Sequence, residues 1–208
     1  SEATLDAIYA VSATRQGGGR GGGGMRFSPR AGLVGEEGER YLQESLPMRR
    51  CLPGGLVPDE IRVFSVRSED AAAAALKDAL VKAWMGTRKP TAWPGFDLLV
   101  AYRMGSVWRW EGVEVKASVE PLGEDIEFEW TDNELRAARG HHGDQAWPVD
   151  CYRIGCVTAL WALGDHGQLL APRVTWLTDP AALLDQKRLT LTTVARPRHM
   201  LRARMGKR

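Results

Sequence analysis

The sequence predicts a mixed α/β fold, in which helices pack on a mixed central sheet. One set of windows carries the apolar spacing and capping residues of helices, and another set alternates between apolar and polar residues as strands do. The order along the chain is a helix, a strand and a helix, then three successive strands, a helix and a further strand. Helices that alternate with strands in this way share a sheet, so we expect one α/β domain.

The N-terminal part of the chain predicts a helix, a linker and a second helix. Residues 4–14 have the composition of a short helix, and the stretch GGGRGGGG at 17–24 predicts a flexible linker. Residues 32–46 predict a helix whose apolar face carries Leu42 and Leu46. The expected divisions are a helix and linker, a main domain and a basic tail, at residues 1–30, 31–190 and 191–208.

The middle of the chain predicts a strand, a helix and a hairpin. Residues 61–66 alternate as a strand, and Ser68 is a suitable N-cap for a helix over 68–84. Gly105 lies in a short turn between two further strands, which is typical of a hairpin. These two strands are expected at 95–102 and 106–118.

The C-terminal half predicts two strands and two helices. Residues 126–131 alternate as the third strand of a meander, and a helix over 131–139 begins with Thr131 as its N-cap. Residues 149–160 predict the next strand. A last short helix is expected near 180–186.

Composition places the protein in the soluble globular class. The chain has 208 residues, of which 44% are hydrophobic and 26% charged. It lacks the run of about 18 apolar residues that predicts a membrane-spanning helix. The three cysteines lack the spacing of a metal site, which favours a reducing, cytoplasmic compartment.

Charge is unevenly distributed, although the formal net charge is only +2. The segment from Ala195 to the end contains no acid and is rich in arginine, whereas Glu120 to Glu134 contains seven acids and no base. A basic end suits a polyanion such as DNA, and it is equally the composition of a solvated tail. The candidate DNA-binding residues are Arg196, Arg198, Arg202, Arg204, Lys207 and Arg208.

The strand at 106–118 carries the first candidate site residues, Glu114 and Lys116. Side chains two apart in a strand share a face, so this pair is either an ordinary surface ion pair or part of a site. Asp97 begins the preceding strand and can lie across from Glu114 in a hairpin. Glu39 falls on the apolar face of its helix, where a lone carboxylate is costly unless it is paired or bound to a metal. Glu134 fits a capping box with Thr131, and chemistry is its second possible role.

Carboxylates on adjacent strands favour a hard divalent cation, Mg²⁺ or Mn²⁺, bound by Asp97, Glu114 and Glu39. Such a cation lowers the pKa of a bound water and stabilises charge on a phosphodiester. Lys116 can orient that water or stabilise the developing charge. Glu39, Asp97, Glu114 and Lys116 are therefore the candidate catalytic residues.

Five short motifs occur in order along the chain: GEEGERYL (35–42), PGFDLLV (94–100), VEVKAS (113–118), WTDNEL (130–135) and CYRIGCV (151–157). Together they resemble the PD-(D/E)XK nuclease superfamily, and more narrowly its family of NO VEIN C-terminal domains, an Mrr-like branch. The resemblance covers roughly residues 33–158 and implies a restriction-endonuclease-like core of helix, three-strand meander, helix and strand. Residues 55–93 depart from the family pattern as an inserted strand and helix.

The resemblance implies a Mg²⁺-dependent endonuclease that acts on DNA, with Asn133, Glu134 and Tyr152 at accessory positions. It also implies that such a domain is the C-terminal module of a larger bacterial defence or restriction protein, with helicase-like or ATPase-like modules as partners. The alternative is a catalytically silent module of the same fold that binds nucleic acid or a protein. A third possibility is an assembly domain whose acidic stretch, Glu120 to Glu134, faces a basic surface.

Overall fold

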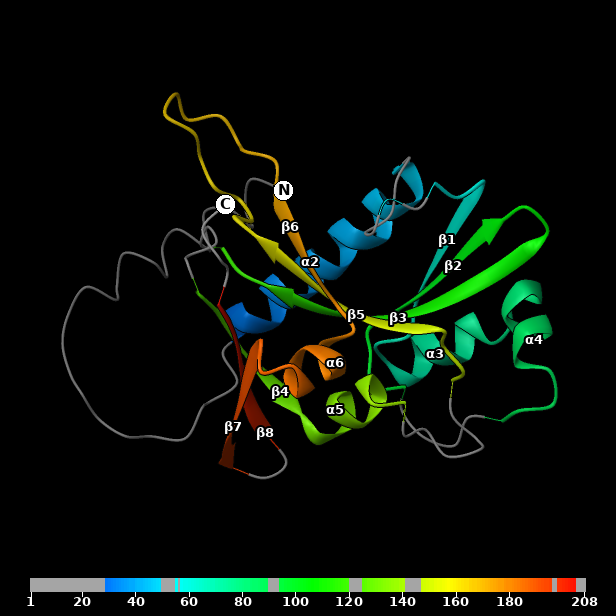
Figure 1. Cartoon of the computed structure of the whole chain (residues 1–208). Coiled ribbons are helices and arrows are strands. Elements are labelled where there is room, and N and C mark those ends of the chain that lie inside the picture. Colours follow the sequence, from blue (N-terminus) through cyan, green and yellow to red (C-terminus); the bar gives the residue numbers. More distant parts are fainter. Residues whose placement is uncertain are drawn as a thin grey trace.

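The computed structural model describes most of the chain from residue 29 onward (Figure 1). The described residues are 29–49, 55, 57–89, 94–119, 125–140, 147–195 and 198–204. The helix expected at 4–14 and the glycine-rich stretch at 17–24 lie outside them. The helices are α2 (Pro29–Ser45), the short 3-10 helix η1 (Leu46–Met48), α3 (Glu69–Ala75), α4 (Ala79–Met85), α5 (Asp132–Ala138) and α6 (Pro180–Asp185). The strands are β1 (Glu60–Ser65), β2 (Leu98–Met104), β3 (Val107–Ala117), β4 (Asp125–Thr131), β5 (Cys151–Thr158), β6 (Arg173–Thr178), β7 (Leu189–Ala195) and β8 (Arg198–Arg204).

A five-stranded mixed sheet forms the centre of the fold, in the order β1-β2-β3-β5-β6. Strands β1, β2 and β3 form an antiparallel meander, β5 runs parallel to β3, and β6 is antiparallel to β5. The expected hairpin is present as β2 and β3, whose register pairs Leu98 with Val113. The mixed α/β fold predicted from the sequence is therefore confirmed.

Helices cover both faces of this sheet. Figure 1 shows α2 on one side and α3 to α6 on the other. On the α2 side, Leu42 and Leu46 are buried against Val113 and Val115 of β3. A Cβ added to Gly38 would lie 2.5 Å from Ala117 Cβ, so the absence of a side chain at this position lets α2 approach β3 closely.

The opposite face carries the larger, tryptophan-rich core. Trp130, Trp147 and Phe96 are among the largest fully buried side chains, and they belong to one cluster with Ile154 of β5 and Leu99 of β2. Strands β2 and β5 are buried along nearly their whole length, as expected for inner strands of a sheet covered on both faces. Asp97 lies directly before β2, two residues after Gly95, which lies against Asn133 and Ala137 of α5.

The expected three-strand meander is corrected in one respect. Residues 126–131 form β4, but β4 pairs with β8 in a separate three-stranded sheet of order β4-β8-β7. The free edge of β3 is taken by β5, and the antiparallel meander instead begins with β1, the strand that the sequence suggested was an insertion. Alternation shows that a segment is a strand without showing which strand it pairs with.

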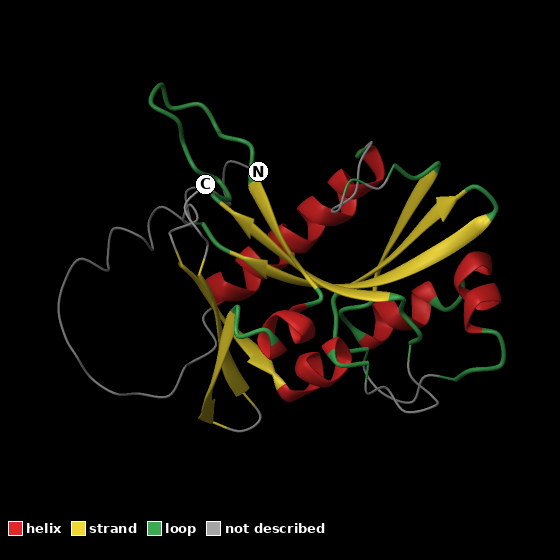
Figure 2. Ribbon diagram, in the orientation of Figure 1, coloured by secondary structure: helices red, strands yellow, loops and turns green. Residues whose placement is uncertain are grey.

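The C-terminal tail predicted at 191–208 is also corrected. All of its described residues belong to β7 and β8 (Figure 2). Leu201 of β8 is fully buried. The run LTLTTV at 189–194 is rich in β-branched residues, and the structure pairs it with β8. The basic composition of this segment therefore does not mean that it lacks regular structure.

The helix expected over 68–84 is two helices, α3 and α4. Ser68 caps α3 as predicted, because its side chain accepts a hydrogen bond from Ala71 N–H. Asp78 then starts α4, since its Oδ1 accepts a hydrogen bond from Leu80 N–H at 2.8 Å. A side chain that binds nearby backbone in this way competes with helix continuation, which explains the break. None of the described helices is long and apolar enough to cross a membrane.

Candidate functional site

Asp97 is held rigidly where strands β2 and β3 begin to pair. It lies directly before β2, and its backbone N–H donates to Val113 O at 3.0 Å. Its side-chain Oδ2 accepts a hydrogen bond from Val115 N–H at 2.8 Å. The register that pairs Leu98 with Val113 sets Asp97 across from Glu114, as the sequence predicted.

Lys116 connects two carboxylates on the α5 side of the sheet. Its Nζ donates to Glu114 Oε1 at 2.7 Å and to Glu134 Oε1 at 3.2 Å. The exposed fractions of these side chains are 20% for Lys116, 6% for Glu114 and 15% for Glu134. The Glu114–Lys116 pair is thus part of a largely buried cluster and not an exposed surface ion pair.

The cluster has more carboxylates than cations, and the pKa values of Glu114, Asp97 and Lys116 are shifted. Burial raises the pKa of Glu114 well above its usual value, Asp97 and Glu134 raise it further, and Lys116 opposes them. Burial also raises the pKa of Asp97, against the hydrogen bond from Val115. Burial favours neutral Lys116, but Glu114 and Glu134 outweigh it and leave its pKa above the usual value. Lys116 is therefore held in its charged form.

Glu134 caps α5, as the sequence predicted, and it also contacts Lys116. Its Oε2 accepts a hydrogen bond from Thr131 N–H at 2.7 Å, and Thr131 Oγ1 accepts one from Glu134 N–H at 3.2 Å. This is the predicted capping box at the start of α5. Because its other oxygen binds Lys116, the cap also fixes one carboxylate of the cluster.

Of the accessory residues, Tyr152 binds the turn that precedes Asp97, and the backbone of Asn133 lies close to it. Tyr152 Oη donates to Gly95 O at 3.1 Å, and burial raises the pKa of this hydroxyl well above its usual value. Gly95 has a φ of +73°, and a Cβ at this position would lie 2.8 Å from the backbone oxygen of Asn133. Tyr152 can therefore affect the position of Asp97 without contacting a substrate, because it fixes the Gly95 turn.

Glu39 approaches the site from the opposite side of the sheet. It lies on α2, its side chain is 14% exposed, and its Oε1 accepts a hydrogen bond from Arg67 at 3.2 Å. Burial, with the charge of Asp97 as a second cause, raises the pKa of Glu39 to about 7, although Arg67 opposes the shift. Glu39 and Asp97 are therefore close enough to repel each other, and Glu39 faces the packed side of its helix as predicted.

The residues suit a hard cation in type, but the structure does not gather a three-ligand cage. Among the described residues, no group of three or more His, Cys, Asp or Glu side chains is arranged to hold a metal. Mg²⁺ is often bound by one or two carboxylates with water and substrate phosphate completing its shell. Asp97 and Glu114 provide two such carboxylates, and Glu39 would need to move toward them to add a third.

The predicted DNA-binding residues divide into two groups. Arg196, Lys207 and Arg208 lie outside the described residues. Arg198, Arg202 and Arg204 belong to β8, whose register sets Arg202 opposite Glu127 and Arg204 opposite Asp125 of β4. The basic strand β8 thus pairs with β4, which is part of the acidic stretch. Acidic residues of β4 therefore lie across from basic residues of β8.

Arg67 is the residue that sequence reasoning missed. It follows β1, and its Nη1 and Nη2 donate to Glu39 and Glu36 at 3.2 and 3.3 Å. A hollow of about 330 Å³ opens beside it, lined in part by Glu36, Glu39 and Arg67. The sequence offered only a weak signal, a basic residue just beyond a strand whose partner strand begins directly after Asp97.

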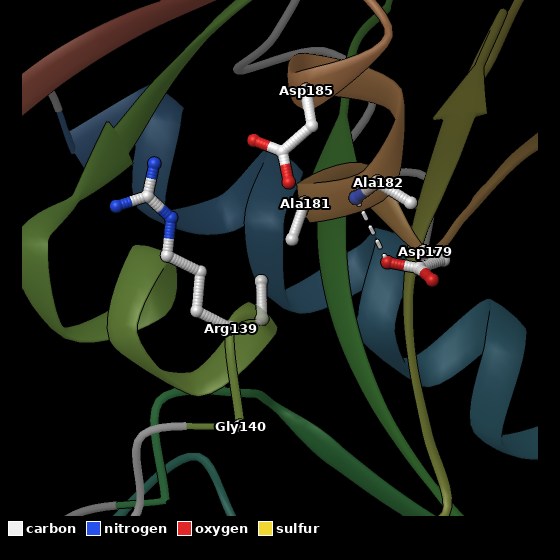
Figure 3. Close-up of a pocket in the computed structure, with 7 residues that line it drawn as sticks. Arg139, Gly140, Asp179, Ala181, Ala182 and Asp185 are labelled. Carbon is white, nitrogen blue, oxygen red and sulfur yellow. Dashed lines mark hydrogen bonds between the residues drawn. The ribbon is translucent and has the colours of Figure 1, made fainter.

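A second hollow, of about 610 Å³, lies between the end of α5 and α6 (Figure 3). Arg139 flanks it from one side and Asp185 from the other. Asp179 Oδ1 accepts a hydrogen bond from Ala182 N–H, so this carboxylate is used as a cap for α6. None of the candidate catalytic residues lines this hollow.

Comparison of the chain with protein-family models, with curated proteins and with solved structures gave no match. Function must therefore be argued from the cluster around Lys116 and from the order of the elements that carry it.

Proposed function

We propose that this protein hydrolyses phosphodiester bonds in DNA with the help of a divalent cation. The observation that carries the proposal is the largely buried lysine of an E-x-K strand, 20% exposed, held between Glu114 and Glu134 beside the fixed carboxylate of Asp97. A surplus of buried carboxylates is costly unless a cation or a proton compensates them. Perturbed groups that converge in this way are typical of functional sites.

The order of the elements supports the same proposal. Helix α2 is followed by the antiparallel meander β1-β2-β3, then by α5 and the parallel strand β5. This order is similar to the helix, three-strand meander, helix and strand of the nuclease superfamily that the motifs resemble, and the similarity supports the proposal. In this chain β1 provides the first strand of the meander, α3 and α4 lie between β1 and β2, and β4 belongs to the separate small sheet.

Asp97 and Glu114 would hold Mg²⁺ or Mn²⁺ at the open end of the hairpin. The cation supplies positive charge that stabilises the phosphodiester in the transition state. Lys116 then has two tasks that its position allows: its ammonium can hold a water by a hydrogen bond, or it can stabilise the developing negative charge. Glu134 keeps this ammonium charged and oriented, and Tyr152 keeps Asp97 in position through the Gly95 turn.

One observation favours the alternative, a silent module that binds nucleic acid or protein. Lys116 is already engaged by both glutamates, and an ion-pair network of this kind can serve stability or specificity alone. In that case the same residues would fix the fold around β3 and α5 without any reaction.

Cleavage of supercoiled plasmid DNA in Mg²⁺ or Mn²⁺ distinguishes the two functions. We expect the parent protein to nick or linearise the plasmid, and Lys116→Ala to be inactive. Asp97→Asn is the matched variant, because an amide oxygen can still accept the Val115 N–H while the charge is lost. Cleavage by Lys116→Ala at the parental rate would exclude the nuclease function and leave the silent module.

A further inference from the structure

A guanidinium lies exposed at the edge of the carboxylate cluster. Arg67 is 39% exposed and borders the hollow of about 330 Å³ on the α2 side. The residue before it, Val66, donates its N–H to Asp97 O at 2.8 Å, so the backbone ties Arg67 to the start of β2. Arg67 is thus attached to the same corner of the sheet as the candidate cation ligands.

The contacts of Arg67 leave part of its hydrogen-bonding capacity for another anion. Arginine has five N–H donors in a planar fork. Glu36 and Glu39 each receive one hydrogen bond from a different nitrogen, and the distances, 3.3 and 3.2 Å, are long for a charged pair. The side chain of Glu36 is 59% exposed, so this contact is also weakened by solvent.

The carboxylates around this corner of the sheet outnumber the cations, so an accessible cation such as Arg67 matters for binding an anion. Five carboxylates, those of Glu36, Glu39, Asp97, Glu114 and Glu134, lie around two cations, Lys116 and Arg67. Lys116 is largely buried and already binds two of these carboxylates. A polyanion approaching this corner of the sheet would therefore meet Arg67 as the accessible positive charge of the cluster.

Arg40 also borders the hollow, but it is differently engaged. It contacts Glu37 and donates to Glu44 Oε1 at 2.9 Å, one helical turn away on the same helix. These i,i+3 and i,i+4 pairs keep it on the outer surface of α2. Arg67 is the arginine whose partners include a candidate site residue.

We propose that Arg67 binds a backbone phosphate of the DNA strand beside the cleavage position, exchanging its contact with Glu39 for that phosphate. The inference rests on the proposed function, because Glu39 can release Arg67 at little cost only when a divalent cation compensates its charge. A planar fork suits a phosphate, which can accept two parallel hydrogen bonds. Such a contact positions the strand without reading its sequence.

Fluorescence anisotropy with a fluorescein-labelled DNA duplex tests this contact without relying on cleavage. Binding is measured in Ca²⁺ and in EDTA, with a gel to show that the DNA remains intact. The matched control for Arg67→Gln is Arg62→Gln, since Arg62 is a 43% exposed arginine of β1 whose ion pair is with Asp78 at the start of α4. Unchanged urea midpoints would show that both variants are folded.

In Ca²⁺, we expect Arg67→Gln to weaken binding about tenfold and to lower the salt slope by about one, the effect of losing one phosphate contact. Arg62→Gln should bind as the parent does. Arg67→Lys should keep the salt slope but recover only part of the affinity, because lysine lacks the fork. In EDTA, where Glu36 and Glu39 retain Arg67, the effect of Arg67→Gln should be smaller.

The outcomes separate this inference from the proposed function. The parent protein could cleave plasmid in Mg²⁺ while Arg67→Gln binds the duplex as tightly as Arg62→Gln does. That result would refute the proposed contact between Arg67 and a phosphate and would leave the proposed nuclease function intact. If DNA binding depends on Arg67 but neither Mg²⁺ nor Mn²⁺ supports plasmid cleavage, the Arg67–phosphate contact is supported and the proposed hydrolysis is excluded. Absence of measurable binding by the parent overturns the contact.

Discussion

Replacing Gly95 by alanine should strongly lower the free energy of unfolding, because alanine would have both an unfavourable backbone conformation and a steric clash at this position. Gly95 has a φ of +73°, and an alanine in the left-handed region costs about 1–2 kcal/mol. The added Cβ would also lie 2.8 Å from Asn133 O and 2.9 Å from Ala137 Cβ, inside van der Waals contact. Overpacking of this kind typically costs about 1–3 kcal/mol, so the sum is roughly 2–5 kcal/mol.

Gly105→Ala is the matched control for the conformational cost. Gly105 lies in the turn of the β2–β3 hairpin with a φ of +60°, and a Cβ added there would have no neighbour within 4 Å among the described residues. We therefore expect Gly105→Ala to lose about 1–2 kcal/mol, from the backbone cost alone. The difference between the two variants measures how tightly α5 packs against the Gly95 turn.

Urea unfolding followed by tryptophan fluorescence gives both free energies. In Gly95→Ala the turn must move away from Asn133, and this displaces Asp97, two residues along the chain. We expect any folded Gly95→Ala protein to lose plasmid cleavage, whereas Gly105→Ala keeps it. Equal destabilisation of the two variants would refute the claim that α5 packs tightly on this turn.

Three further predictions follow from other contacts. Glu134→Ala should be about 1 kcal/mol less stable to urea than Glu134→Gln, because glutamine at this position can still cap Thr131 N–H; equal stabilities would contradict the capping role. Glu39 has a folded pKa of about 7 against the usual 4.5, so the folded state holds a proton that the unfolded state has lost between these values. Without divalent cation, parental stability should therefore fall relative to Glu39→Gln as the pH rises through this window, and parallel pH profiles would contradict the raised pKa. Deletion of residues 196–208 removes β8 and buried Leu201, so it should lower the urea midpoint, and an unchanged midpoint would show that the small sheet adds no stability.

The hairpin and its charged residues could be predicted because their signals are local. Two alternating segments around Gly105 specify β2 and β3, and the two-residue period of a strand sets Glu114 and Lys116 on one face. The capping box at Thr131 was equally local. The sequence placed Tyr152 on a strand and Glu39 on a helix. It did not indicate their hydrogen-bond partners, Gly95 and Arg67, because these lie far away along the chain.

The errors concern pairing between distant segments. The alternation of 126–131 indicated a strand, yet nothing within it indicates β8 as the partner in place of β3. The basic composition of the C-terminal segment concealed β8, whose register sets arginines opposite the acids of β4. Arg67 was missed because its importance comes from Glu39, which is brought to it only by the packing of α2 on the sheet.

The pairing of β4 with β8 has a consequence for how the protein is made. Strand β4 leads directly into Thr131 and the capping box, so the segment that delivers Glu134 to Lys116 is supported by a strand synthesised much later. During translation, the hairpin carrying Asp97, Glu114 and Lys116 can form before residues 198–204 have left the ribosome, but β4 then lacks its partner. Domains generally fold as units during synthesis. We therefore expect nascent chains that stop before β8 to hold Lys116 without a fixed Glu134, which delays any activity until the small sheet is complete.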